Sequence, residues 1–181
     1  MLLKLYKNED DVTLYWEAWE DEDEITLHFG QLGSPGQTVT LPLNEFEPPE
    51  TAIKREAKKA RDAGFRELKP DELYELIVQF PVTGSAGADD VENAQRVEEV
   101  LNECLGWTGN GQCEGHDIGH DVSGTTMNIY CHVVDPQAAA EAIVDELTCS
   151  QLLGDAIIAY QERDESFKVL WPEDYSGVFH Y

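Results

Sequence analysis

Short runs of β-forming residues alternate with clusters of turn residues near the start of the chain. Residues 12–19, 25–29 and 38–41 are rich in branched and aromatic residues, a composition typical of strands. Five consecutive acids at 20–24 repel one another, which predicts a solvated hairpin tip. Residues 30–37 hold three Gly and one Pro and predict a second turn. This pattern favours an antiparallel sheet.

Apolar positions at helical spacing follow the predicted sheet. Ile53, Ala57 and Ala60 form one stripe, as expected of a helix that buries one face. Pro49 suits a first helical turn, where its missing N–H costs nothing, and Gly64 suits a C-terminal cap. The sequence therefore predicts one helix between these two residues.

The exposed face of this predicted helix carries the one basic cluster of the chain. Cations near a helix C-terminus complement the macrodipole, which is one interpretation of the cluster. The other is a contact surface for an acidic partner, either a nucleic acid or the acidic second half of this chain. The cluster consists of Lys54, Arg55, Lys58, Lys59 and Arg61.

Strand patterns return in the second half. Residues 73–81 form an apolar run, and 127–133 alternate strictly between apolar and polar residues, which is the strand period. Residues 155–160 and 167–171 are shorter runs of the same kind. The Gly-rich, polar segment 112–119 is a weaker strand, and its polarity suits a sheet edge.

Two helices separate these strands. Asp89 and Glu92 resemble a capping box, and Asp135 followed by Pro136 is typical of an N-cap and the first helical position. The order of elements is βαββαβ with one further strand, which is the ferredoxin-like pattern. The expected buried positions are Val91, Ala94, Val97, Val100, Leu101 and Cys104 in the first helix, and Ala139, Ala142, Ile143 and Leu147 in the second.

Charge divides the chain at the same point as the pattern. The 181 residues have a formal net charge of -25, of which residues 1–70 contribute -6 and residues 71–181 contribute -19. Pro70 and its polar neighbours suit a junction, so we expect an α+β protein with domains at 1–70 and 71–181. This charge argues against a general nucleic-acid coat and against binding to an anionic membrane surface. No secretory leader or apolar span is evident, which favours a soluble cytoplasmic protein.

The first 70 residues resemble the WGR domain, an antiparallel sheet with one helix. Phe29, Gly30 and Gln31 occupy the Trp-Gly-Arg motif, and the Gly-rich turn and helix follow in the family's order. The resemblance implies contacts with DNA ends or neighbouring domains, as WGR domains make in poly(ADP-ribose) polymerases. Gln31 replaces the motif's Arg and lacks its charge and bidentate fork, which weakens the implied phosphate contact.

Candidate chemistry is concentrated in residues 113–121. Cys113, His116, His120 and Asp121 are ligand types that zinc accepts, although an extended strand would separate the two imidazoles by about 13 Å. The alternatives are a polar edge strand and a small-molecule site. The four cysteines lack paired spacing, and without a secretory leader we expect reduced thiols.

Catalytic motifs are missing from the sequence. It contains no phosphate-binding loop and no nucleophile elbow, and we expect no enzyme activity and no cofactor. The aromatic tail 171–181 either packs on its own domain or docks on a partner. The first hypothesis is a non-catalytic interaction or regulatory protein with a protein partner. Nucleic-acid binding through residues 1–70 is the second, and a metal-dependent enzyme is the third.

Overall fold

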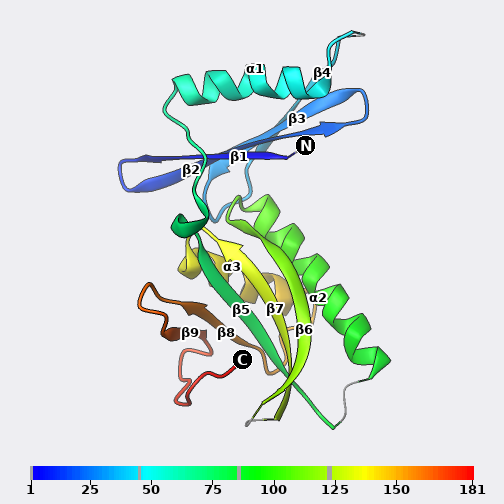
Figure 1. The fold of residues 1–181 in the computed structure, drawn as a ribbon, viewed down its shortest axis with the longest axis vertical. Coiled ribbons are helices and arrows are strands. Elements are labelled where there is room, and N and C mark those ends of the chain that lie inside the picture. The colour runs from blue at the N-terminus through cyan, green and yellow to red at the C-terminus, as the bar shows by residue number, and fades with distance from the viewer. Residues whose placement is uncertain (1, 45, 85–86, 122–123) are drawn as a thin grey trace. The chain divides into compact units, whose positions relative to one another are not determined.

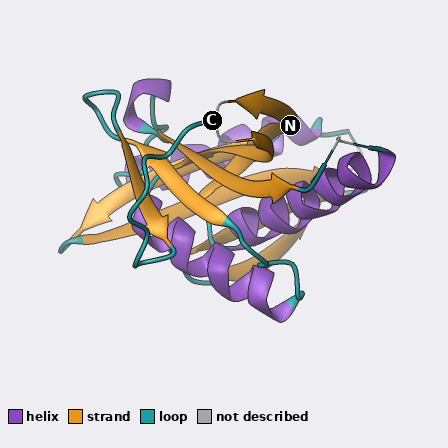
Figure 2. Ribbon diagram, turned by 90° about the horizontal axis from the view of Figure 1, so that it is seen from below, coloured by secondary structure: helices purple, strands orange, loops and turns teal. Residues whose placement is uncertain are grey.

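The chain folds into two compact units. The computed structural model describes the chain except for residues 1, 45, 85–86 and 122–123. The first unit comprises Met1–Pro70 with Trp107–Gly109, and the second comprises Asp71–Gly106 with Asn110–Tyr181. Each unit pairs an antiparallel sheet with helices, so the α+β class predicted from the sequence is confirmed (Figures 1 and 2).

A four-stranded sheet in sequential order forms the first unit. Its strands are β1 (Leu3–Glu9), β2 (Val12–Asp21), β3 (Glu24–Gln31) and β4 (Gln37–Pro42). The sequence pattern does not indicate β1, because Lys4 and Lys7 interrupt its apolar run. Residues of β1 adopt the strand conformation because they pair with β2 along the whole length of β1.

Helix α1 (Pro49–Asp62) packs on this sheet through the predicted stripe. Ile53 and Ala57 are fully buried and Ala60 nearly so, against Leu5, Trp16 and Ile25 among others. At the β2–β3 turn, the acids at 20–24 are all exposed, as the sequence predicts. Apart from β1, the N-terminal sheet and its one helix thus have the predicted layout.

The second unit contains a five-stranded sheet in the order β6-β7-β5-β8-β9. All its strand pairs are antiparallel, with the second strand of the unit at an edge, as the ferredoxin-like pattern predicts. The added strand β9 forms the other edge. The elements are β5 (Tyr74–Val82), α2 (Ala88–Trp107), β6 (Gly111–Asp121), β7 (Gly124–Val133), α3 (Pro136–Cys149), β8 (Ile157–Gln161) and β9 (Phe167–Trp171), preceded by the 3-10 turn η1 (Pro70–Glu72).

Two details of the helices differ from expectation. The capping-box prediction for α2 is wrong, because the helix begins at Ala88 and Asp89 lies inside its first turn. Val91 is 44% exposed and lies outside the buried stripe. The predicted cap of α3 is confirmed: the Asp135 carboxylate accepts hydrogen bonds from the backbone N–H groups of Gln137 and Ala138.

The aromatic tail packs on its own unit. The His180 carbonyl accepts a 2.8 Å hydrogen bond from Gln79 of β5. The Tyr181 ring lies 4.8 Å from the Phe167 ring of β9 and 6.3 Å from the Tyr130 ring of β7. Of the two interpretations of the tail, packing within its own domain fits these contacts.

Candidate functional site

The three residues in the WGR motif positions have different environments at the end of β3. Phe29 is half-buried and packs against the core of the first unit, whereas Gln31 is exposed. Gly30 lies opposite Tyr15, and a Cβ built on it would come within 2.9 Å of the Gly36 backbone. The phenyl ring and the glycine therefore serve packing, and the exposed amide of Gln31 carries no charge for a phosphate.

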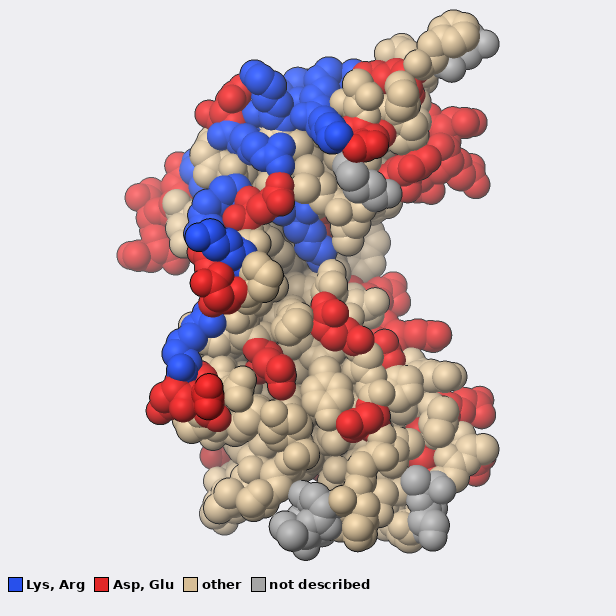
Figure 3. Space-filling model, in the orientation of Figure 1, with Lys and Arg blue, Asp and Glu red and all other residues tan. Residues whose placement is uncertain are grey.

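Each cation of the basic cluster on α1 contacts a carboxylate of its own unit. The distances include 2.5 Å for Lys54–Glu50 and 2.6 Å for Lys59–Glu56. Figure 3 shows carboxylates interleaved with the Lys and Arg atoms that cover this part of the surface. The remaining pairs are Arg55 with Glu47 and Glu56, Lys58 with Asp62, and Arg61 with Glu67.

These pairs leave the α1 surface without excess positive charge, because five cations face five carboxylates. Burial opposes ionisation of Glu56, but hydrogen bonds from Lys59 and Arg55 outweigh it and lower the pKa of this carboxyl. The hydrogen bond from Lys54 lowers the pKa of Glu50. A phosphate must compete with carboxylates that are already in place.

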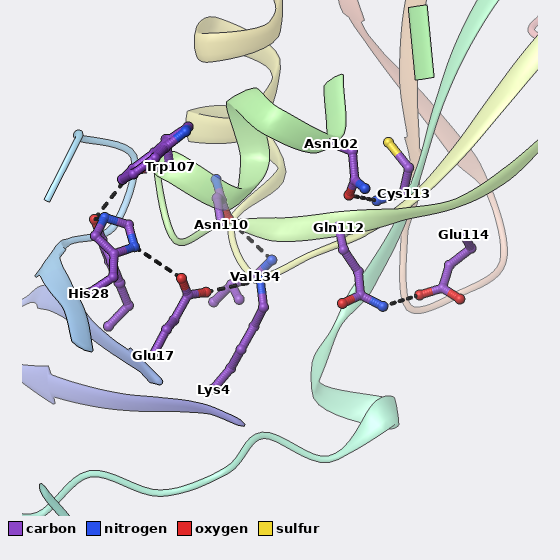
Figure 4. A network of polar contacts seen from close by, with 11 residues as sticks. Lys4, Glu17, His28, Asn102, Trp107, Asn110, Gln112, Cys113, Glu114 and Val134 are labelled. Carbon is purple, nitrogen blue, oxygen red and sulfur yellow. Dashed lines mark hydrogen bonds and ion pairs between the residues drawn. The ribbon is translucent and has the colours of Figure 1, made fainter. Parts of the chain in front are cut away.

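The first unit contains a buried network of titratable side chains. Glu17 Oε2 lies 3.1 Å from His28 Nδ1, and Glu17 Oε1 lies 2.9 Å from Lys4 Nζ (Figure 4). On the other side of the ring, His28 Nε2 lies 3.0 Å from the Tyr15 hydroxyl. The roles of the two ring nitrogens depend on the tautomer: with the proton on Nδ1, the ring donates to Glu17 and Nε2 accepts from the Tyr15 hydroxyl.

The Tyr15–His28–Glu17 network resembles a catalytic triad in composition, but its side chains are inaccessible to substrates. Tyr15 is 0% exposed and His28 is 1% exposed, so no substrate reaches the hydroxyl or the ring. Burial, with a smaller effect of Glu17, raises the pKa of Tyr15 to about 12. A phenol with so high a pKa is a hydrogen-bond donor at neutral pH, which fits a structural role.

Residues Trp107–Gly109 also pack around the Tyr15–His28–Glu17 network. The Trp107 ring lies 5.1 Å from the His28 ring, and its carbonyl lies 3.3 Å from the Tyr15 hydroxyl. The backbone N–H of Gly33 donates a 2.9 Å hydrogen bond to the Thr108 carbonyl. Sequence patterns cannot reveal this insertion, because it joins residues more than seventy positions apart.

The proposed zinc ligands on β6 have separate partners. Cys113 Sγ lies 3.3 Å from Cys131 Sγ, His116 Nδ1 bonds to Glu98, and His120 Nδ1 lies 3.0 Å from Thr125 Oγ1. The backbone of Asp121 pairs with Gly124, and its side chain is outside the described part. Within the described residues no three His, Cys, Asp or Glu side chains lie close enough together to hold a metal ion.

A groove of about 290 Å³ lies between α3 and β9 in the second unit. We call it the α3–β9 groove. Four apolar side chains, each buried or half-buried, form its floor, and three exposed carboxylates and one amide surround them. None of the described residues that line it is basic. The floor consists of Ala140, Val144, Leu170 and Trp171, and the rim of Gln137, Glu141, Asp145 and Glu173.

Comparison with known proteins identifies no family for this chain. No protein-family model, curated protein or solved structure matches the chain. The resemblance of residues 1–70 to the WGR domain therefore rests on its motif positions alone. No described helix combines the length and apolar character that crossing a membrane requires.

The α3–β9 groove leaves little signal in the sequence. Val144 and Trp171 come from two elements that meet only in the fold, and each fits an ordinary amphipathic pattern. The one available signal is the pairing of Glu141 with Asp145 four residues later, which places two acids on one exposed face of α3.

Proposed function

We propose that this chain is a non-catalytic interaction protein, whose α3–β9 groove binds a partner protein through a basic segment carrying an apolar side chain. The observation that supports the proposal is the composition of the groove, with an apolar floor inside a carboxylate rim. An apolar side chain of the partner would displace water from Val144 and Trp171. Flanking Lys or Arg residues would face Glu141 and Asp145.

Charge complementarity selects this class of partner. Residues 71–181 carry a net charge of -19, so the groove lies in a strongly negative domain. Such a field repels nucleic acids and anionic lipids and accelerates encounter with cationic proteins. A basic peptide segment is the one common macromolecular ligand that has both the required charge and an apolar side chain.

The size of the groove favours a side chain over a cofactor. Its volume of about 290 Å³ lies just below the roughly 300–1,000 Å³ of small-molecule pockets. Together with the closed Tyr15–His28–Glu17 network, this supports a binding role without catalysis or a cofactor.

A peptide titration followed by NMR tests the proposal. The probe is a synthetic peptide in which lysines flank two adjacent leucines, and the control peptide carries serines in place of the leucines. We expect shifts of the Trp171 indole N–H and the Val144 amide with the first peptide and much smaller shifts with the second. Equal binding of both peptides would contradict the role of the apolar floor.

A matched pair of variants separates the groove from the general field. Glu141→Lys/Asp145→Lys reverses two rim charges, and Glu92→Lys/Glu99→Lys makes the same change at exposed positions of α2. We expect the first variant to weaken peptide binding at least about tenfold, or 1.4 kcal/mol, and the second to weaken it far less. Equal losses would reduce the interaction to non-specific attraction and contradict the proposal.

A further inference from the structure

Two cysteine sulfurs lie in contact on neighbouring strands of the second unit. Cys113 of β6 and Cys131 of β7 are register partners, and their Sγ atoms are 3.3 Å apart. Directly opposed residues of an antiparallel pair have Cα atoms roughly 4.5–5.5 Å apart, within the roughly 4.4–6.8 Å that a disulfide spans. The backbone thus already has a separation that suits a covalent bond between the two sulfurs.

The local backbone is able to accommodate the small remaining movement. The register of β6 shifts between Cys113 and Gly115, where a bulge interrupts the ladder. An edge strand pairs with another strand on one side only, so Cys113 can approach β7 without displacing a strand. On its other side, the Cys113 backbone N–H donates a 3.1 Å hydrogen bond to Asn102 Oδ1, a side chain of α2 (Figure 4). Cys131, in contrast, is fixed in the core and is 0% exposed.

The two thiols differ in the way that a stepwise oxidation requires. Cys113 is half-buried, whereas Cys131 is sealed from solvent. The hydrogen bond with Cys113, and burial, raise the pKa of the Cys131 thiol. Cys131 is therefore a poor target for an external reagent, and its reactive neighbour is Cys113.

We propose that Cys113 and Cys131 form a thiol–disulfide modification site that reacts with a small-molecule disulfide such as oxidised glutathione. The Cys113 thiolate attacks one sulfur of the reagent, forming a mixed disulfide and releasing one glutathione thiolate. The Cys131 thiol then loses its proton and attacks the Cys113 sulfur, which releases the second glutathione. Two protein thiols are oxidised to one disulfide, and one small disulfide is reduced to two thiols.

The product would link the edge strand β6 covalently to β7. Thiol–disulfide exchange needs an in-line approach of the sulfurs, and contact at 3.3 Å supplies the proximity for the second step. This inference concerns strands outside the α3–β9 groove and does not depend on the proposed function.

Two further thiols provide internal comparisons. Cys149 is exposed at the end of α3, and Cys104 is half-buried on α2. Burial raises the pKa of Cys104 to about 11, and nearby carboxylates and Cys113 add to this effect. We expect Cys149 to acquire a persistent glutathione adduct, because no described thiol partner contacts it, and Cys104 to react slowly.

The test uses the full-length Cys149→Ser variant, incubated with oxidised glutathione and analysed by intact mass spectrometry and peptide mapping. We expect the loss of two hydrogen masses and a linked pair of peptides containing Cys113 and Cys131. In the background of Cys149→Ser, the further change Cys131→Ala should stop the reaction at one glutathione adduct on Cys113. Circular dichroism checks that both variants are folded.

Three outcomes would overturn the proposal. They are a persistent glutathione adduct on Cys113 while Cys131 is present, a disulfide between Cys113 and Cys104, and recovery of both thiols unmodified. The first measurement needs no substitution in the core, so a folding defect of the Cys131→Ala variant cannot obscure it.

Discussion

Tyr15 shows how closely individual residues are packed in the first unit. Its hydroxyl lies against His28, and Gly36 approaches it so closely that an added Cβ would come within 2.2 Å of the hydroxyl oxygen. The turn of residues 30–37 is predictable from its composition. The need for glycine at position 36 is not, because it comes from Tyr15, which lies 21 positions away in the sequence. Composition indicates a turn, and tertiary contact fixes which residue is indispensable.

Replacing Gly36 with Ala should destabilise the first unit. The new methyl group would also lie 2.5 Å from the Phe29 carbonyl oxygen, and backbone of a central strand cannot move away cheaply. We expect a loss of at least about 2 kcal/mol in the free energy of unfolding, typical of overpacking. Urea denaturation followed by tryptophan fluorescence measures it.

Gly106→Ala is the control for this substitution. Gly106 lies in α2, and a Cβ there would meet no atom within 4 Å. Alanine is the better helix former, so this variant should gain up to about 1 kcal/mol. If both alanine variants unfold at the same urea concentration, the close contacts around Gly36 do not affect the free energy of unfolding.

The raised pKa of Tyr15 predicts how stability depends on alkaline pH. The phenol has a pKa of about 12 in the folded protein and about 10 when unfolded. Above pH 10 the unfolded chain loses this proton first, so stability should fall as pH rises towards 12, by up to about 1.4 kcal/mol per pH unit. The stabilising effect is complete below pH 10.

Tyr15→Phe removes this contribution and should flatten the decline. The comparison is the slope of unfolding free energy against pH between about 10 and 12, since the substitution also changes stability at neutral pH. An unchanged slope in the variant would show that the Tyr15 phenol is not the titrating group. Other tyrosines whose pKa burial raises remain in both proteins and set the residual slope, among them Tyr6 and Tyr130, the latter with a pKa of about 12.

At the scale of elements, prediction succeeds where local chemistry decides the boundary. The start of α3 follows from Asp135 and Pro136, and the alternation of Met127, Ile129 and Cys131 identifies β7. Prediction fails for β1, whose two lysines interrupt its apolar pattern, because the strand is ordered by its pairing with β2. Elements that depend on a distant partner leave a weak signal in their own sequence.

The cap of α3 provides a test at this scale. Asp135→Ala removes the acceptor of two backbone N–H groups, at 3.0 Å and 3.1 Å, and should cost about 1 kcal/mol. Asp135→Ser, which retains a capping oxygen, should recover most of that loss. Urea denaturation gives the energies, and hydrogen exchange of Ala138 reports the first turn directly. Equal stability of the Ala and Ser variants would contradict a capping role.

At the scale of the whole molecule, charge carries most of the information in the sequence. The contrast between -6 and -19 separates the two halves, and the elements of each half except β1 are visible in its pattern. The insertion of Trp107–Gly109 into the first unit leaves no such trace. The charge count also misses the pairing on α1, because counting residues cannot show which cation contacts which carboxylate.

The pairing of cations with carboxylates on α1 has a consequence for binding to duplex DNA. We expect the protein not to retain end-containing duplex DNA even at about 50 mM salt, where electrostatic attraction is strong. Glu50→Gln/Asp62→Asn/Glu67→Gln removes the carboxylates that contact Lys54, Lys58 and Arg61. If these contacts mask the cations, the triple variant should gain binding that weakens steeply with salt.

The matched control changes total charge by the same amount at another place. Glu92→Gln/Glu99→Gln/Glu103→Gln neutralises three exposed carboxylates of α2, away from any basic cluster, and should not create binding. Each phosphate neutralised contributes about -0.9 to the slope of log affinity against log salt, so the slope of the α1 variant counts its exposed cations. Retention of the unmodified protein would mean that phosphate displaces the carboxylates from α1, and nucleic-acid binding would then replace the partner-protein proposal. Equal binding by both variants would show that net charge, rather than the pairing on α1, keeps DNA away.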